Sequence, residues 1–203
     1  MTKIKLCGLT RPCDIETVNE LKPEYIGFVF ARKSRRYVSA ERAEELKKLL
    51  HPHIKAVGVF VNESVEAVAR LLNNGIIDIA QLHGTEDESY IGQLRKLTNK
   101  SIIKAFRIDS EQDILKAQNS SADFVLLDSG NGGTGTVFDW KLLKNISRPY
   151  FLAGGLDNSN IWEAVSRLNP YAVDVSSGIE TDGLKDKIKM TDFVDVVRKE
   201  DEE

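Results

Sequence analysis

Short apolar segments alternate with longer amphipathic segments along almost the whole chain. Eight runs rich in apolar and β-branched residues, each bounded by polar or turn-forming residues, indicate buried strands. They are 3–6, 25–30, 54–61, 76–81, 102–108, 124–128, 150–153 and 172–175. Apolar residues recur at helical spacing in the segments 11–21, 40–50, 64–73, 86–97, 111–118, 140–144, 159–168 and 192–199. Ser64 begins one of these helices, and its hydroxyl is predicted to cap free N–H groups of the first turn.

The alternation of strands and helices indicates the fold class. Strands that alternate with helices form parallel βα units, and eight such units in one chain predict a closed (β/α)₈ TIM barrel. We expect a single α/β domain that takes in residues 1–203. An open, doubly wound sheet is the alternative, but no G-x-G-x-x-G motif follows the first strand to favour a dinucleotide-binding fold.

Composition and charge narrow the set of partners. The 203 residues are 41% hydrophobic and 29% charged with a formal net charge of -3, which suits one substantial core and gives no wide basic surface for nucleic acid. The basic residues Arg32, Lys33, Arg35 and Arg36 form a short cluster, suited to holding a local anion. No signal segment precedes the first strand and no run approaches ~18 apolar residues. We therefore expect a soluble, cytoplasmic protein without a membrane partner, and the sequence leaves open whether it forms a homodimer.

Cysteine and histidine spacing bears on metals and disulfides. The chain has two cysteines, Cys7 and Cys13, and three histidines, His51, His53 and His83. Neither a disulfide framework nor a recognisable zinc spacing results. The sequence therefore predicts chemistry without a metal or other cofactor.

In a (β/α)₈ barrel the loops after the strands build the active site, so the strand ends are the places to look for chemistry. Asp128 ends an apolar strand, and a loop with four glycines within six positions follows it. Glycine allows a backbone to approach a ligand closely, so this segment is predicted to form one edge of an active site, with Gly133 and Gly135 near the substrate. The plainer interpretation is a surface turn after a core strand.

The last two predicted strands run into glycine turns, Gly154–Gly155 and Ser176–Ser177–Gly178. Such turns expose backbone N–H groups, and a following helix N-terminus also favours an anion. We predict that these residues bind a phosphate group, as the corresponding loops do in many barrels. The first strand ends at Cys7, which Gly8 follows, and the second is followed by the basic cluster.

Eight short motifs together resemble the phosphoribosylanthranilate isomerase family of tryptophan biosynthesis. In chain order they are K-L-C-G-L-T, S-R-R-Y-V, Q-L-H-G, L-L-D-S with G-G-T-G and F-D-W, A-G-G-L, and D-V-S-S-G-I-E. The resemblance spans Lys5 to about Lys187. It implies a cofactor-free Amadori rearrangement of N-(5-phosphoribosyl)anthranilate to 1-(2-carboxyphenylamino)-1-deoxyribulose 5-phosphate. The family usually has proline where this chain has Arg35, and often proline where it has Asn158.

The resemblance implies that Cys7 is the general base and Asp128 the general acid. The chemistry is consistent, because ring opening needs a proton on the ring oxygen and isomerisation needs a proton removed from C2′. Burial at a strand end would favour a protonated Asp128, and an inward-facing Lys5 could lower the pKa of Cys7. Arg36 would offer a planar partner for the anthranilate carboxylate. His83 is interpreted as a structural hydrogen-bonding residue and is left out of the catalytic set.

Other interpretations remain open for these residues. Cys7 could be an inert core residue, Asp128 a cap, and Arg36 a solvated loop charge. Among enzymes, the alternatives are the histidine-pathway isomerase with two aspartates and an indole-glycerol-phosphate synthase-like lyase with a catalytic lysine; Cys7 argues against both. A phosphate-binding barrel without activity is a further alternative, which an intact acid and base disfavour.

Overall fold

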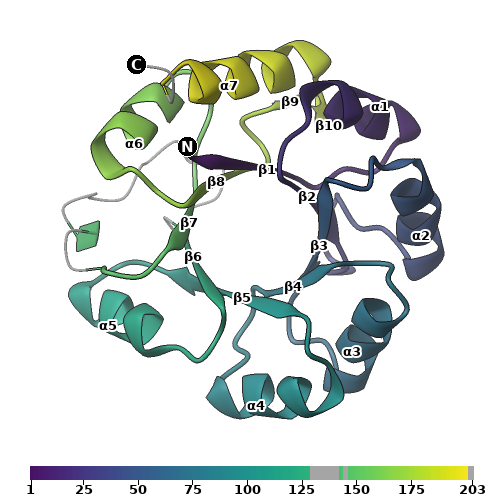
Figure 1. Cartoon of the computed structure of the whole chain (residues 1–203), viewed down its shortest axis with the longest axis vertical. Helices are drawn as coiled ribbons and strands as arrows, with labels where there is room; N and C mark the ends of the chain where they lie inside the picture. The colour runs from purple at the N-terminus through teal and green to yellow at the C-terminus, as the bar shows by residue number, and fades with distance from the viewer. Residues whose placement is uncertain (129–141, 144–145, 201–203) are drawn as a thin grey trace.

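The computed structural model describes residues 1–128, 142–143 and 146–200. In this part of the chain, eight parallel strands pair in sequence order, and the eighth pairs with the first to close a barrel that helices surround (Figure 1). The predicted (β/α)₈ barrel is therefore confirmed. That one domain takes in all of residues 1–203 stays a prediction.

The barrel strands coincide closely with the predicted apolar runs. They are β1 (Lys3–Cys7), β2 (Tyr25–Val29), β3 (Lys55–Phe60), β4 (Ile79–Leu82), β5 (Ser101–Arg107), β6 (Phe124–Asp128), β7 (Tyr150–Ala153) and β8 (Ala172–Val175). The described helices are α1 (Pro12–Leu21), α2 (Ala40–Leu49), α3 (Val65–Asn73), α4 (Glu88–Leu97), α5 (Glu111–Asn119), α6 (Ile161–Leu168) and α7 (Lys187–Glu200). Of the predicted helix 140–144, only residues 142–143 are described, and they form a short helical turn.

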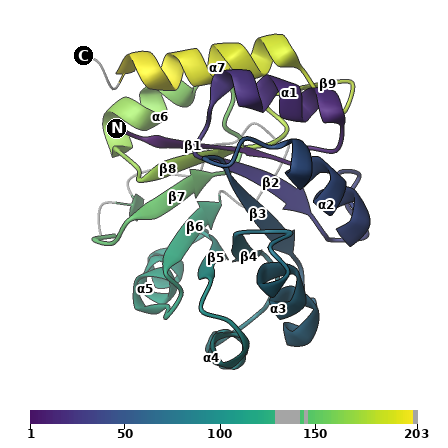
Figure 2. The ribbon, with the colours of Figure 1, turned by 45° about the vertical axis from the view of Figure 1, so that its right-hand side comes forward.

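Two features at the C-terminal end of the chain differ from the prediction. A small antiparallel hairpin, β9 (Glu180–Thr181) and β10 (Leu184–Lys185), follows the eighth barrel strand and was not predicted. The last helix begins at Lys187 rather than at residue 192, because the Asp186 carboxylate accepts hydrogen bonds from the first-turn N–H groups of Ile188 and Lys189. This helix packs against α1 and α6 on the outside of the barrel (Figure 2).

The helix starts otherwise follow ordinary capping chemistry. Ser39 and Asp87 cap α2 and α4 through side-chain oxygens that accept backbone N–H groups. Ser64 does occupy the N-cap position of α3, but its side chain makes no capping bond, so that part of the prediction is wrong.

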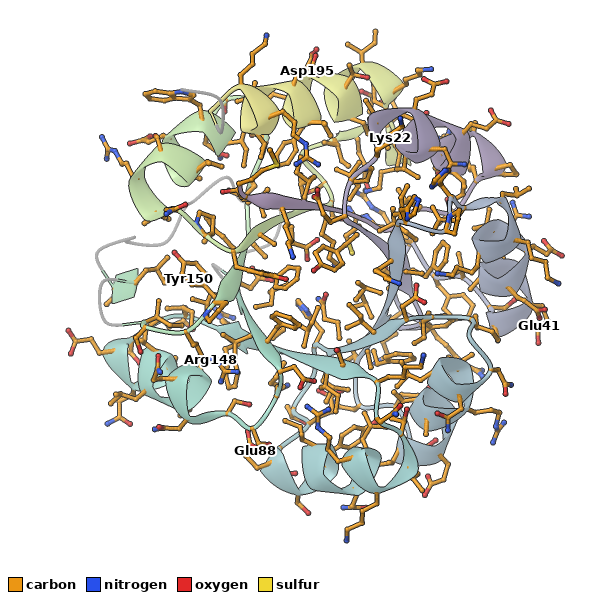
Figure 3. All side chains as sticks on the ribbon, in the orientation of Figure 1. Lys22, Glu41, Glu88, Arg148, Tyr150 and Asp195 are labelled. Carbon is orange, nitrogen blue, oxygen red and sulfur yellow. The ribbon has the colours of Figure 1, made fainter. Side chains whose placement is uncertain are left out.

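Side-chain alternation along the strands divides the core into layers. Residues of one parity face the helices, and those of the other fill the barrel, where Tyr25, Val57, Ile103, Leu126 and Phe151 belong to one buried cluster. Figure 3 shows side chains filling the barrel interior, whereas Glu41 and Asp195 extend outward from the helices α2 and α7. The barrel is therefore a packed core, and only the inward residues at the strand ends are free to form a site.

Candidate active site

A cavity of about 710 Å³ opens at the carboxyl ends of the barrel strands. Its size is that of a site for a small organic molecule. Most of the predicted site residues lie on its wall, namely Cys7, Arg36, Asp128, Gly154, Gly155, Ser176 and Ser177. Gly178 belongs to the turn just beyond the wall, and Gly133 and Gly135 lie outside the described residues.

Cys7 is the last residue of the first strand and is only 7% exposed. It pairs in register with Gly27 of the second strand. A Cβ atom at Gly27 would lie 2.5 Å from the sulfur, far inside van der Waals contact. The absence of a side chain at Gly27 therefore makes the room in which the Cys7 thiol sits.

Three charged groups surround the Cys7 thiol. Burial raises its pKa above the ordinary thiol value; the charges of Lys5 and Lys185 lower it, and that of Asp174 raises it. Lys5 is fully buried below Cys7, with its Nζ 2.9 Å from both carboxylate oxygens of Asp174. Lys5 thus faces inward and acts in the predicted direction. The net effect is opposite to the expectation, because burial outweighs the lysine charges.

Asp128 ends the sixth strand on the same cavity, and His83 lies beside it. The Nε2 atom of His83 is 3.4 Å from Oδ2 of Asp128, and Nδ1 is 3.0 Å from Nε2 of the buried Gln81. If the Gln81 amide donates to Nδ1, the neutral imidazole carries its proton on Nε2, the nitrogen that faces Asp128. The sequence interpretation of His83 as a structural hydrogen-bonding residue did not include this contact, since residues 83 and 128 come together only when β4 and β6 pair on either side of β5.

The Arg36 guanidinium makes two hydrogen bonds with the carboxylate of Glu180, from Nε to Oε1 at 2.5 Å and from Nη2 to Oε2 at 2.8 Å. Arg35 donates to Oε2 at 2.6 Å and Lys185 to Oε1 at 2.7 Å. Burial by itself raises the pKa of Glu180, but the hydrogen bonds and charges of Arg36 and Lys185 lower it to about 2. Glu180 is therefore ionised at neutral pH, and three cations surround this one carboxylate.

Glu180 and Lys185 were missed because the hairpin that carries them was not predicted. The signal was present in Asp182–Gly183, since an Asp-Gly pair is a preferred two-residue hairpin turn. Both residues have positive φ, 52° and 80°, as that turn requires. Burial lowers the pKa of Lys185, and its contact with Glu180 opposes that shift.

The two glycine turns predicted to bind phosphate lie next to each other. Gly154 and Gly155 have positive φ, 92° and 66°, and a bridge between Asp157 and Gly178 joins their loop to the turn after the eighth strand. The Asn160 side chain holds the first turn by donating to the Gly155 carbonyl at 2.8 Å. This arrangement presents the backbone of both turns at one corner of the barrel mouth.

Arg107 and Asn62, which end or follow two other strands, are not on the described wall of this cavity. Arg107 pairs with Asp109, and the side chain of Asn62 accepts hydrogen bonds from Thr85. Within the described residues, no group of three or more His, Cys, Asp or Glu side chains is placed to hold a metal ion. None of the described helices combines the length and apolar character that crossing a membrane requires.

The fold and this site define a (β/α)₈-barrel enzyme whose cavity carries groups suited to acid–base chemistry on an anionic small molecule. The model of the N-(5'phosphoribosyl)anthranilate (PRA) isomerase family matches residues 4–196. The chain belongs to this family, and it is an isomerase of tryptophan biosynthesis.

Individual relatives are similar to this chain over nearly its whole length. The N-(5'-phosphoribosyl)anthranilate isomerase of Endomicrobium trichonymphae is 46% identical over 202 residues, which cover 98% of this chain and 99% of that protein. The solved monomers of dimeric phosphoribosylanthranilate isomerase from Thermotoga maritima superpose with a TM-score of 0.86 at 34% identity, covering 98% and 100%. A phosphoribosylanthranilate isomerase in complex with reduced 1-(o-carboxyphenylamino)-1-deoxyribulose 5-phosphate has a TM-score of 0.86 at 32% identity, covering 98% and 100%.

Proposed function

We propose that Cys7 and Asp128 are the general base and general acid of the rearrangement of N-(5-phosphoribosyl)anthranilate to 1-(2-carboxyphenylamino)-1-deoxyribulose 5-phosphate. The observation that supports this is their position on the wall of one cavity, at the ends of strands β1 and β6. The pair supplies both functions that the reaction needs without a cofactor. Each proton transfer contributes ~10² to 10⁴ in rate.

The reaction proceeds in two steps. Asp128 gives a proton to the furanose ring oxygen, the bond between C1′ and that oxygen breaks, and the nitrogen lone pair forms the C1′=N double bond. Cys7, as the thiolate, then removes the proton from C2′ to form an enolamine, which becomes the ketone when C1′ gains a proton and the C2′ hydroxyl loses one. The positive charge of Lys5 favours the thiolate, and we propose that it assists this step.

The remaining predicted residues bind the two ends of the substrate. The phosphate lies at the turns Gly154–Gly155 and Ser176–Ser177–Gly178, and the carboxylate pairs with Arg36. Supporting this division, the turns and Arg36 line the same cavity as Cys7. Gly133 and Gly135 are proposed to approach the substrate from the loop after β6.

A fluorescence assay tests the proposal. Purified protein should remove the fluorescence of phosphoribosylanthranilate, and neither Cys7→Ser nor Asp128→Asn should do so at a comparable rate. A crystal grown with phosphate should show the anion at the backbone of Gly155 and Ser177. Phosphate bound only elsewhere would contradict this placement.

Two broader expectations belong to the same proposal. A biosynthetic function of this kind is consistent with a cytoplasmic enzyme that needs neither nucleic acid nor membrane. A homodimer is proposed by analogy with the dimeric relative, and sedimentation velocity of the full chain tests it.

A further inference from the structure

Glu180 is a buried carboxylate that the proposed chemistry does not use. Its side chain is 4% exposed, compared with 21% for its partner Arg36 and 60% for Arg35. A carboxylate beside the intended site of a substrate carboxylate would repel it, unless other charges compensate. Three cations, Arg35, Arg36 and Lys185, contact Glu180, so the cluster as a whole stays positive.

The contact fixes the orientation of Arg36. Its Nε and Nη2 atoms donate to the two oxygens of Glu180, and such a paired arrangement holds the guanidinium plane. Within the described residues no protein group accepts a hydrogen bond from Nη1. Since Arg36 lines the cavity, its outer edge remains available to a ligand.

Glu180 is itself held from several sides. Lys185 bonds to its carboxylate at 2.7 Å and also to the backbone oxygen of Ser176 at 2.7 Å. Lys189 donates to the Glu180 carbonyl at 2.7 Å. These bonds attach the hairpin that carries Glu180 to the end of the eighth strand. The Glu180 carboxylate is therefore held in place and can orient Arg36.

Gly8 fixes the other side of Arg36. A Cβ atom at Gly8 would lie 2.4 Å from Cδ of Arg36, so the arginine stem passes directly over the glycine that follows Cys7. The position of the guanidinium relative to the proposed base is thus set by Gly8 below and Glu180 beside it.

We propose that Glu180 is a positioning residue that orients Arg36 for the aromatic carboxylate of the substrate. The inference rests on the proposed role of Arg36. The hairpin β9–β10 would then contribute to substrate specificity. Because Glu180 acts through Arg36, it should affect the binding only of substrates that carry a carboxylate.

Glu180→Gln tests the proposal with two substrates, N-(5-phosphoribosyl)anthranilate and N-(5-phosphoribosyl)aniline, which lacks the carboxylate. For the first substrate, the variant should raise KM by about tenfold and change kcat by less than twofold. For the second substrate, KM should stay near the wild-type value. Leu184→Ala, at an exposed position in the same hairpin, is the matched control and should leave KM unchanged for both substrates. The double variant Arg36→Met/Glu180→Gln should raise KM for the first substrate no more than Arg36→Met alone does.

The outcomes separate the two proposals. Equal losses on both substrates would make Glu180 a purely structural residue and overturn the inference. An effect of Arg36→Met on KM without one of Glu180→Gln would also overturn it, while the role of Arg36 stands. No effect of Arg36→Met would remove the proposed carboxylate anchor itself. If Glu180→Gln folds poorly by circular dichroism, Glu180→Asp keeps the charge but shortens its reach, and the same difference between substrates is expected.

Discussion

His83 and Asp128 lie side by side at the mouth of the barrel, with Nε2 of the histidine 3.4 Å from Oδ2 of the aspartate. The contact joins strand ends that are not neighbours in the sheet, since β5 lies between β4 and β6. A neutral imidazole that donates toward Asp128 would hold the carboxyl group in a defined orientation. The proposed acid is therefore contacted by a residue from a second strand end.

Asp128→Asn should lower kcat by ~10² or more while leaving KM broadly unchanged, because the amide cannot give up a proton to the ring oxygen. Steady-state kinetics with phosphoribosylanthranilate measure this. Asp123→Asn, which lies just before the same strand and removes a partner of Arg95, is the matched control and should affect stability rather than kcat. A near-normal kcat in Asp128→Asn would show that ring opening does not depend on this acid.

Cys7→Ser should also lower kcat by ~10² or more, since a hydroxyl loses its proton far less readily than a thiol. Burial raises the pKa of Cys7, and a base must be deprotonated to act, so kcat/KM of the wild type should increase with pH through the neutral range. The pH profiles of both proteins measure the effect. Cys13→Ser, at an exposed cysteine, should retain the wild-type profile. An unchanged profile in Cys7→Ser would assign the base elsewhere.

Arg36→Met should raise KM more than it lowers kcat, if the guanidinium binds the carboxylate equally in the ground and transition states. A lost hydrogen bond to a charged group costs about 1.5–3 kcal/mol, or roughly 10- to 150-fold in affinity. Arg35→Met is the natural comparison, because Arg35 shares Glu180 but is 60% exposed, and KM should change by less than about threefold. If KM is unchanged in Arg36→Met, the carboxylate is bound by Arg35 or Arg32.

Gly27→Ala should impair activity although residue 27 lies on a neighbouring strand. The new methyl group would meet the Cys7 sulfur at 2.5 Å, so either the thiol or the strand must shift. A lower kcat together with slower labelling of Cys7 by a thiol reagent is expected. Gly92→Ala, in helix α4 with nothing within 4 Å, should raise the free energy of unfolding by about 0.4–1 kcal/mol and keep activity. Equal activity in the two variants would contradict this view of Gly27.

Glu180 should stabilise the fold in a pH-dependent way. Its folded-state pKa is lowered to about 2 from an ordinary value of 4.5, so its stabilising contribution is complete above pH ~5 and disappears as pH falls through 2. The shift corresponds to about 3 kcal/mol at most. Urea unfolding of wild type and Glu180→Gln should therefore differ by less at pH 2 than at pH 6. Leu184→Ala removes no carboxylate, so its difference from the wild type in free energy of unfolding should be similar at both pH values.

The sequence pattern was sufficient to predict the barrel. Eight apolar runs separated by helical patterns leave few alternatives, because each buried strand needs partners on both sides and a helix over its outer face. It also placed Cys7 and Asp128 correctly at strand ends on the cavity wall, since strand parity and length are local properties. Their proposed roles came from the family resemblance.

The contacts of these residues depend on the folded arrangement of the strands. Arg36 meets Glu180 across 144 positions of sequence, and Lys5 meets Asp174 across 169, contacts that exist only because the first and eighth strands pair. The pKa of Cys7 likewise depends on burial and on charges from residues far apart in the chain, a balance that no local pattern encodes. Local sequence specifies each βα unit, but electrostatic interactions depend on distance in space, and closure of the barrel sets that distance.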